Sequence, residues 1–174
     1  VGLDGVGTGT GTLLLNGSGT YLYNGYLRDQ DNGGTTNKLN LIESGSGFQA
    51  ISGVNVNYTG PTSITGGTLQ LIDTRNFRSA LAISAPGVLE INSSTPFATR
   101  WNYGQTISGN GTLNKTGTGV FGIIGVSNFA GQINLQQGTI HNDNLTANWN
   151  GSTADVNISA GATLDLRGNN IPID

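Results

Sequence analysis

An internal repeat is the feature that most constrains what this chain can fold into. The segment Glu43-Ser-Gly-Ser-Gly-Phe48 matches Lys115-Thr-Gly-Thr-Gly-Val120, and the match resumes with Tyr58-Thr-Gly60 over Phe129-Ala-Gly131. Two further pairs follow in the same order, namely Leu81–Ala85 with Val156–Ala160 and Val88–Ile91 with Thr163–Leu166. Self-similar segments in a shared order are typical of repeat architectures, in which each unit packs only on its neighbours.

The repeated segments carry the pattern of half-buried β-strands. Short clusters such as Leu69-Gln-Leu-Ile72, Val88-Leu-Glu-Ile91 and Ile133-Asn-Leu135 alternate apolar and polar residues, as a strand with one buried face requires. No window keeps the three-four spacing of an amphipathic helix. Turns rich in Gly and Asn separate the clusters at intervals of roughly ten residues. The sequence therefore predicts a folded, all-β chain.

Composition narrows the class of partner. Only 10% of the 174 residues are charged, the net charge is −3, and Lys and Arg number 7. A basic surface is what phosphate neutralisation needs, so nucleic acid is excluded as a main partner. The apolar runs are far shorter than the ~20 residues of a membrane-spanning helix, so we expect no membrane insertion of this segment. There is no Cys and only 1 His, which leaves little room for thiol or histidine chemistry.

The spacing of the strands fits two all-β architectures. A globular sandwich also places strands at intervals of about 8–12 residues. A stacked solenoid explains in addition why the same apolar positions recur with gaps confined to turns, because each coil lays its side chains on those of the previous coil. With coils of about 20–25 residues, the repeat predicts a parallel β-helix of roughly seven or eight coils.

A family resemblance rests on the repeated residues. Lys115-Thr-Gly-Thr-Gly-Val-Phe121, Phe129-Ala-Gly131 and Gln137-Gly-Thr-Ile140 together resemble the autotransporter-associated β-strand repeat, also called the passenger-associated transport repeat. A second copy combines Tyr58-Thr-Gly60 with Thr65–Leu71. The resemblance covers roughly residues 42–91 and 105–168. It implies a right-handed parallel β-helix in the passenger of a Gram-negative autotransporter, on the cell surface or secreted.

The resemblance also bears on domain organisation. Residues 1–174 are expected to be a single β-helix segment excised from a longer passenger, because neither a signal peptide nor an outer-membrane barrel is evident in the sequence. The stretch Tyr21–Lys38 has no counterpart in the second unit, and we expect it to form a loop or an irregular coil.

Candidate site residues are few. Arg100, Trp101 and Tyr103 form the best cluster, and exposed aromatic rings there would stack on sugar rings. The alternative is that these rings pack a coil edge. His141 lies close to Asp143, but a lone His without further ligands does not make a metal site. The acidic residues are scattered, whereas a polysaccharide hydrolase needs clustered carboxylates, so no catalytic, metal or cofactor residue is predicted.

Three functions follow from this pattern. The leading hypothesis is a non-enzymatic surface rod that serves adhesion or self-association, with host or bacterial surface molecules, glycans among them, as partners. The alternatives are a carbohydrate-binding or polysaccharide-degrading β-helix, which would use Arg100, Trp101 and Tyr103, and a spacer or export-folding module.

Overall fold

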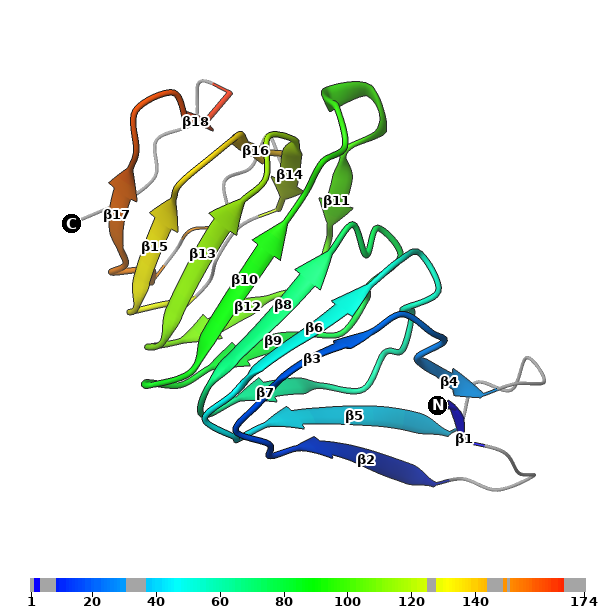
Figure 1. The fold of residues 1–174 in the computed structure, drawn as a ribbon. Coiled ribbons are helices and arrows are strands. Elements are labelled where there is room, and N and C mark those ends of the chain that lie inside the picture. The colour runs from blue at the N-terminus through cyan, green and yellow to red at the C-terminus, as the bar shows by residue number, and fades with distance from the viewer. Residues whose placement is uncertain are drawn as a thin grey trace.

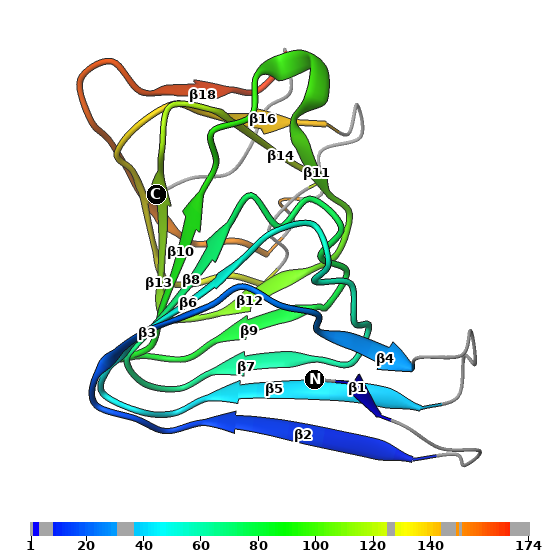
Figure 2. The same ribbon diagram turned by 45° about the vertical axis from the view of Figure 1, so that its right-hand side comes forward.

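The chain winds into a parallel β-solenoid with three faces (Figures 1 and 2). The computed structural model describes residues 2–3, 9–30, 37–124, 128–143, 149 and 151–167. All strand pairs among them are parallel. The expected all-β parallel solenoid is thereby confirmed, and the sandwich alternative is excluded.

The first face is the largest sheet and crosses the front of Figure 1. Its strands, in sheet order, are β17 (Asp155–Ile158), β15 (Gln132–Leu135), β13 (Thr112–Thr116), β10 (Val88–Asn92), β8 (Thr68–Ile72), β6 (Phe48–Ser52) and β3 (Thr20–Tyr23). From β3 to β17 the chain makes about six turns, fewer than the seven or eight coils expected. The first coil is long, since Thr20 lies opposite Phe48, whereas Val88 lies opposite Thr68.

The other two faces complete each coil. The second face contains, in sheet order, β12 (Ile107–Gly109), β9 (Leu81–Ile83), β7 (Thr62–Ile64), β5 (Lys38–Glu43) and β2 (Thr10–Leu15). The third face contains β11 (Trp101–Tyr103), β14 (Val120–Ile123), β16 (Thr139–Asn142) and β18 (Thr163–Asp165). At the N-terminal end of the third face, β1 (Gly2–Leu3) pairs with β4 (Arg28–Gln30).

Register places like residues on like residues along the stack. One inward column of the first face runs through Gln49, Leu69, Leu89, Leu113, Ile133 and Val156. The neighbouring outward column holds Gln70, Glu90, Asn114, Asn134 and Asn157. Asn134 Nδ2 donates to Asn114 Oδ1 at 2.9 Å, and Asn157 Nδ2 donates to Asn134 Oδ1 at 3.1 Å. Glu90 is the one charged member of this column, so the low charge of the sequence becomes a largely uncharged polar ladder on the outside, as β-stacking in register favours.

The third face is interrupted in the middle of the molecule. Leu27, which directly precedes β4, forms an isolated bridge with Val56, and the next coil crosses this face through residues 73–80 without a strand. Phe77, which is 3% exposed, occupies the interior at this point. The interruption explains why β4 and β11 belong to separate sheets (Figure 1).

Glycine allows the corners of successive coils to approach closely. A Cβ on Gly45 would fall against the carbonyl oxygen of Gly17, and one on Gly117 would fall against that of Ser93. Gly117 also has a φ of +72°, which L side chains rarely adopt. Both glycines of the repeat therefore lie in equivalent surroundings, against the backbone of the preceding coil.

The two copies of the repeat lie on adjacent faces. Glu43 ends a strand of the second face and leads into the first face, whereas Lys115 lies in the first face and leads into the third. Leu89 in β10 and its repeat partner Leu164 in β18 show the same displacement. One repeat length therefore corresponds to three coils and one further face. The repeated sequence is a strand–corner–strand unit that forms the corner between the second and first faces in one copy and between the first and third faces in the other.

The stretch Tyr21–Lys38 contains regular structure. Most of β3 and all of β4 fall within it, and β5 begins at Lys38. Residues 31–36 of this stretch lie outside the described residues, so the expected loop or irregular coil stays a prediction there.

Candidate functional site

The residues singled out in the sequence separate into buried and outward-facing groups. Trp101 and Tyr103 point inward from β11 and are each 1% exposed. Trp101 packs edge to face on Phe121 at 5.0 Å between ring centroids, and Tyr103 stacks on Phe77 at 6.0 Å. Tyr103 Oη donates to the carbonyl oxygen of Ser79 at 2.6 Å. Neither ring presents a face to solvent, so the pair forms core packing and has no surface on which a sugar could stack.

Burial of the Tyr103 hydroxyl also raises the pKa of that group above its ordinary value. The phenol therefore stays protonated and keeps its hydrogen bond to the Ser79 carbonyl oxygen.

Arg100 lies on the outside of the same face and holds a loop in place. Residues 93–100 connect β10 to β11 and include the short 3₁₀ helix Phe97–Thr99. Arg100 Nη2 forms an ion pair with Asp143 Oδ1 at 2.6 Å, and its Nε donates to the same atom at 3.0 Å. The guanidinium also lies 4.3 Å from the Phe97 ring centroid. The connection projects beyond the coils in Figures 1 and 2.

His141 completes this cluster. Its Nδ1 lies 2.7 Å from Asp143 Oδ1, and its ring meets that of Phe97 at 4.8 Å. His141 stands in the outward column of the third face but is only 2% exposed, because the 93–100 loop covers it. Gly122, the preceding residue in that column, leaves the space that Asp143 occupies. These contacts hold the projecting loop of residues 93–100 against the third face, and Phe97 on that loop remains 52% exposed.

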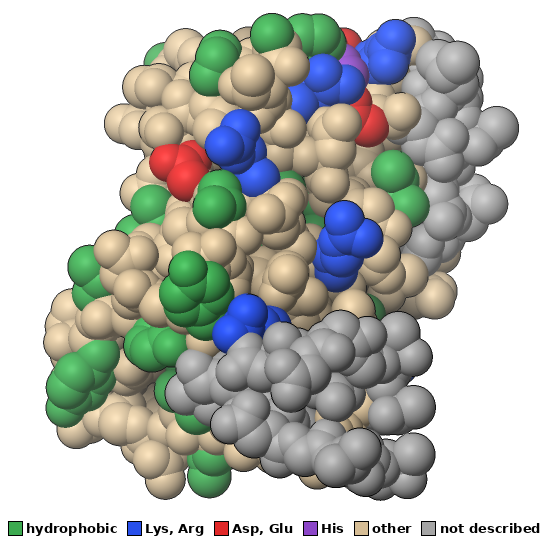
Figure 3. All heavy atoms as spheres, turned by 90° about the vertical axis from the view of Figure 1, so that its right-hand side faces the viewer, with side chains coloured by type: hydrophobic (Ala, Val, Ile, Leu, Met, Phe, Trp, Pro, Cys, Tyr) green, Lys and Arg blue, Asp and Glu red, His purple; other side chains and the backbone are tan. Residues whose placement is uncertain are grey.

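A second surface lies in the interrupted part of the third face, which the sequence did not single out. A polar cavity of about 210 Å³ is lined by Arg75, Phe77, Arg78, Asn102, Gly104 and Gln105. Arg75 and Arg78 are exposed, and neither guanidinium has an ion-pair or hydrogen-bond partner among the described residues. Figure 3 views the side of the molecule on the right of Figure 1 and shows Lys and Arg side chains along its height. Sequence spacing alone would not have found the cavity, because its residues come from two successive coils.

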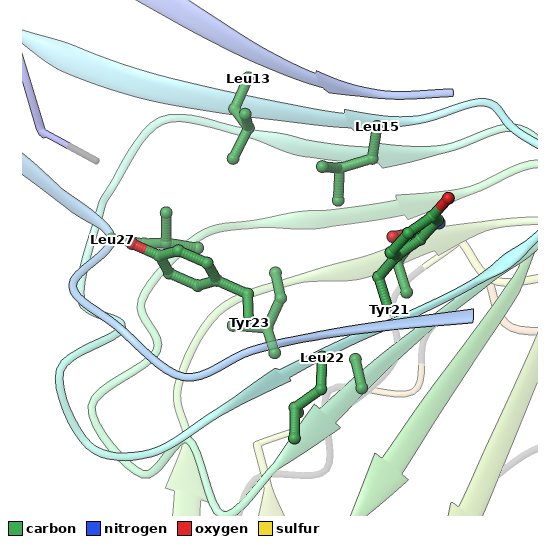
Figure 4. Close-up of a pocket in the computed structure, with 9 residues that line it drawn as sticks. Leu13, Leu15, Tyr21, Leu22, Tyr23 and Leu27 are labelled. Carbon is green, nitrogen blue, oxygen red and sulfur yellow. The ribbon is translucent and has the colours of Figure 1, made fainter. Parts of the chain in front are cut away.

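A third surface is the N-terminal end of the core. An apolar cavity of about 250 Å³ is lined there mainly by Leu13, Leu15, Tyr21, Tyr23 and Leu27 (Figure 4). These residues form the inward layer of the first coil. Tyr21 is 61% exposed and Leu22 is 65% exposed, since β3 has a strand partner on one side only among the described residues.

The described residues show no arrangement suited to catalysis by a metal. No group of three or more His, Asp or Glu side chains within them is placed to hold an ion. None of their helices is long and apolar enough to span a membrane.

Comparison with known proteins finds a distant relative of this chain. The chain is similar to the adhesin BmaC autotransporter of Brucella suis biovar 1 (strain 1330), with 28% identity over 191 aligned residues. The alignment covers 92% of this chain and 6% of the relative, so the chain spans a small part of the relative's length. No family model matches the chain. No solved structure matches it. A β-solenoid is consistent with a passenger domain, as the repeat resemblance implied.

Proposed function

We propose that this chain is a structural segment of the surface-exposed passenger of a Gram-negative autotransporter, where it serves adhesion or self-association without catalysis. The observation that carries the proposal is the solenoid of about six turns with largely uncharged polar ladders along its outside. Such a rod offers the same weak contact repeatedly, and linked weak contacts give high avidity. The similarity to an autotransporter adhesin over most of the chain supports the same function.

Self-association is one part of the proposed function, and in the 174-residue chain the edge strands of the described coils are the surfaces that would carry it. The sheet orders place β3 at one edge of the first face and β17 at the other. Ile158 on β17 is 50% exposed, and Tyr21 on β3 is 61% exposed. Among the described residues, each of these two strands has a strand partner on one side only, and such a parallel edge is a template for a further strand, from an adjoining coil of a longer chain or from a second copy.

Adhesion is tested with beads coated with the 174-residue chain. We expect the binding of coated beads to bacterial or host cells to rise more steeply than the coating density, because multivalent contacts give avidity beyond that of each single contact. Asn134→Ala removes one rung of the outward ladder and should leave bead binding nearly unchanged. Complete loss of binding in this variant would show that one residue carries the function, and release of reducing sugars from a polysaccharide would show an enzyme.

Self-association is measured by sedimentation at increasing protein concentration. The wild-type chain should form larger species as concentration rises, and Tyr21→Lys should suppress them because a charge at an exposed edge blocks strand addition. A mostly exposed side chain is replaced, so the fold should be retained, which circular dichroism would check. Equal sedimentation of the two proteins would exclude the N-terminal end as the contact.

A further inference from the structure

We propose that the cavity between Arg75 and Arg78 binds one acidic sugar residue of a polysaccharide, through its carboxylate or sulfate group. This inference rests on the proposed adhesive function and names the ligand class for one of its contacts. Two cationic side chains line the cavity, and none of its lining residues is acidic. The chain as a whole carries a net charge of −3, so this local excess of positive charge is a feature of the site and not of the composition.

The arginine-bearing segment is held rigidly from beneath. Phe77 is 3% exposed and packs on Tyr58 at 5.5 Å and on Tyr103 at 6.0 Å between ring centroids. Asn76 Nδ2 donates to the Val54 carbonyl oxygen at 2.8 Å, which ties the segment to the preceding coil.

Ser79 fixes the other end of this segment. The Ser79 side chain is fully buried, and its Oγ donates to the Gly60 carbonyl oxygen at 2.6 Å. Arg75 and Arg78 therefore flank a fixed core residue and extend into solvent from a backbone that has little freedom left to lose on binding. Such preorganisation lowers the entropic cost of binding a ligand.

The free guanidiniums determine which group the site recognises. Arg100 is already paired with Asp143, but Arg75 and Arg78 have no partner among the described residues. A guanidinium presents a planar fork of donors that matches a carboxylate or sulfate oxygen pair. The anion would lie between the two forks and form charge-assisted hydrogen bonds with both.

The remaining lining residues favour an acidic sugar over other anionic ligands. Asn102 and Gln105 carry amides, each of which both donates and accepts hydrogen bonds, as sugar hydroxyls do. A cavity of about 210 Å³ is smaller than the roughly 300 Å³ at which pockets for drug-sized ligands begin, so it holds a single small ring. A Cβ on Gly104 would meet no atom within 4 Å, which leaves the cavity open for a polymer to continue. With 7 Lys and Arg in all, the chain lacks the cations that a nucleic acid needs.

Titration calorimetry on the 174-residue chain tests the assignment. The probes are an oligogalacturonate, which carries carboxylates, and a heparin-derived oligosaccharide, which carries sulfates. Dextran supplies hydroxyls without charge, and oligoglutamate supplies carboxylates on a polypeptide. We expect one or both acidic saccharides to bind, with an affinity that falls as salt concentration rises. Binding that is equally tight for dextran or oligoglutamate, or no binding of either acidic saccharide, would overturn the proposal.

Charge-matched variants separate this cavity from the general field of the protein. Arg75→Gln with Arg78→Gln should weaken saccharide binding at least tenfold. Lys38→Gln with Arg167→Gln removes the same two charges elsewhere and should weaken it less than twofold. Asn102→Asp places a negative charge in the cavity and should weaken binding, with circular dichroism checking that the fold is retained beside Asp143. Equal affinities for the two double variants would refute the site.

Calorimetry and the bead assay together distinguish this inference from the proposed function. If the chain binds no acidic saccharide but coated beads still bind cells, the cavity assignment fails and the adhesive function stands. If neither binding is observed, both fail.

Discussion

Two corners of the solenoid share one sequence pattern and bury opposite charges beneath it. We call residues 43–48 the Glu43 corner and residues 115–120 the Lys115 corner. Both side chains are 0% exposed. Glu43 Oε1 accepts a hydrogen bond from the Gly45 N–H at 3.0 Å, whereas Lys115 Nζ donates to the carbonyl oxygens of Thr116 and Gly117 at 2.6 and 2.8 Å. A tight corner presents both kinds of backbone group to the interior, so a side chain of either charge can satisfy one kind.

The two corners differ in how fully the buried charge is satisfied. Lys115 Nζ also donates to the Gln137 carbonyl oxygen at 3.3 Å and thereby links its own corner to the next coil. Glu43 Oε2 is buried and has no hydrogen-bond partner among the described residues. The repeat therefore specifies the geometry of the corner. The charged residue at its start decides whether hydrogen bonds link two coils, as with Lys115, or stay within one corner, as with Glu43.

The largest expected effect tests the geometry that the two corners share. Gly117→Ala should lower the free energy of unfolding by about 3 kcal/mol, because it adds left-handed backbone strain and a clash with the Ser93 carbonyl. Gly161→Ala is the matched control, since Gly161 has a φ of +82° and open space around its Cβ position. The control should cost about 1 kcal/mol. Urea unfolding measures both, and equal losses would show that close approach of the coils does not constrain this corner.

The sequence predicted the corners better than it predicted their placement. Turns rich in Gly and Asn between alternating clusters were enough to predict strands joined by tight corners, because few other residues permit this backbone conformation and contact. The face on which each copy falls depends on the length of every intervening coil. That length is set by irregular stretches such as residues 73–80 and 93–100, which carry no repeat signal.

The candidate sites were predicted less well for a related reason. Trp101 and Tyr103 were expected as exposed rings, with packing as the alternative, and both are buried. In a strand of only three residues, the local sequence does not show which side chains point inward. Arg100 meets Asp143 only because coils stack, and Arg75 faces Asn102 for the same reason. Contacts between coils depend on the winding, and a short motif does not contain that information.

A second prediction separates the two charges. Lys115→Leu places an apolar side chain in a column between Ile91 and Leu135 and removes the ammonium group that donates to three carbonyl oxygens. Unsatisfied buried carbonyls should outweigh the relief of burying a cation, and stability should fall by about 2 kcal/mol. Urea unfolding at pH 7 measures the change. Unchanged or increased stability would mean that the ammonium group does not tie the coils.

The same substitution at the other corner should have the opposite sign. Glu43→Leu removes a buried carboxylate with one unpartnered oxygen from a column between Leu15 and Ile64. We expect stability at pH 7 to rise by about 1 kcal/mol, since the loss of one hydrogen bond is smaller than the desolvation cost removed. Glu43→Gln, which keeps the acceptor for Gly45, is the control and should change stability less. A loss of stability in Glu43→Leu would show that the carboxylate stabilises the corner.

The last prediction concerns a difference in pH dependence between the corners. Burial lowers the pKa of Lys115 from 10.5 to about 8, so between these values the unfolded chain binds more protons and stability increases as pH rises. Burial raises the pKa of Glu43 above 4.5, so just above pH 4.5 the folded chain binds more protons and stability decreases as pH rises.

Urea unfolding of the wild type, Lys115→Leu and Glu43→Gln across this pH range tests both slopes. The free energy of unfolding of each variant is subtracted from that of the wild type at each pH. This difference should rise between pH 8 and 10.5 for Lys115 and fall with increasing pH above 4.5 for Glu43. The two profiles report different physics, because the lysine is relieved of a buried charge by losing a proton and the glutamate by keeping one. Flat difference profiles would mean that both side chains reach water at their corners, and the shared pattern would then specify a turn without a buried charge beneath it.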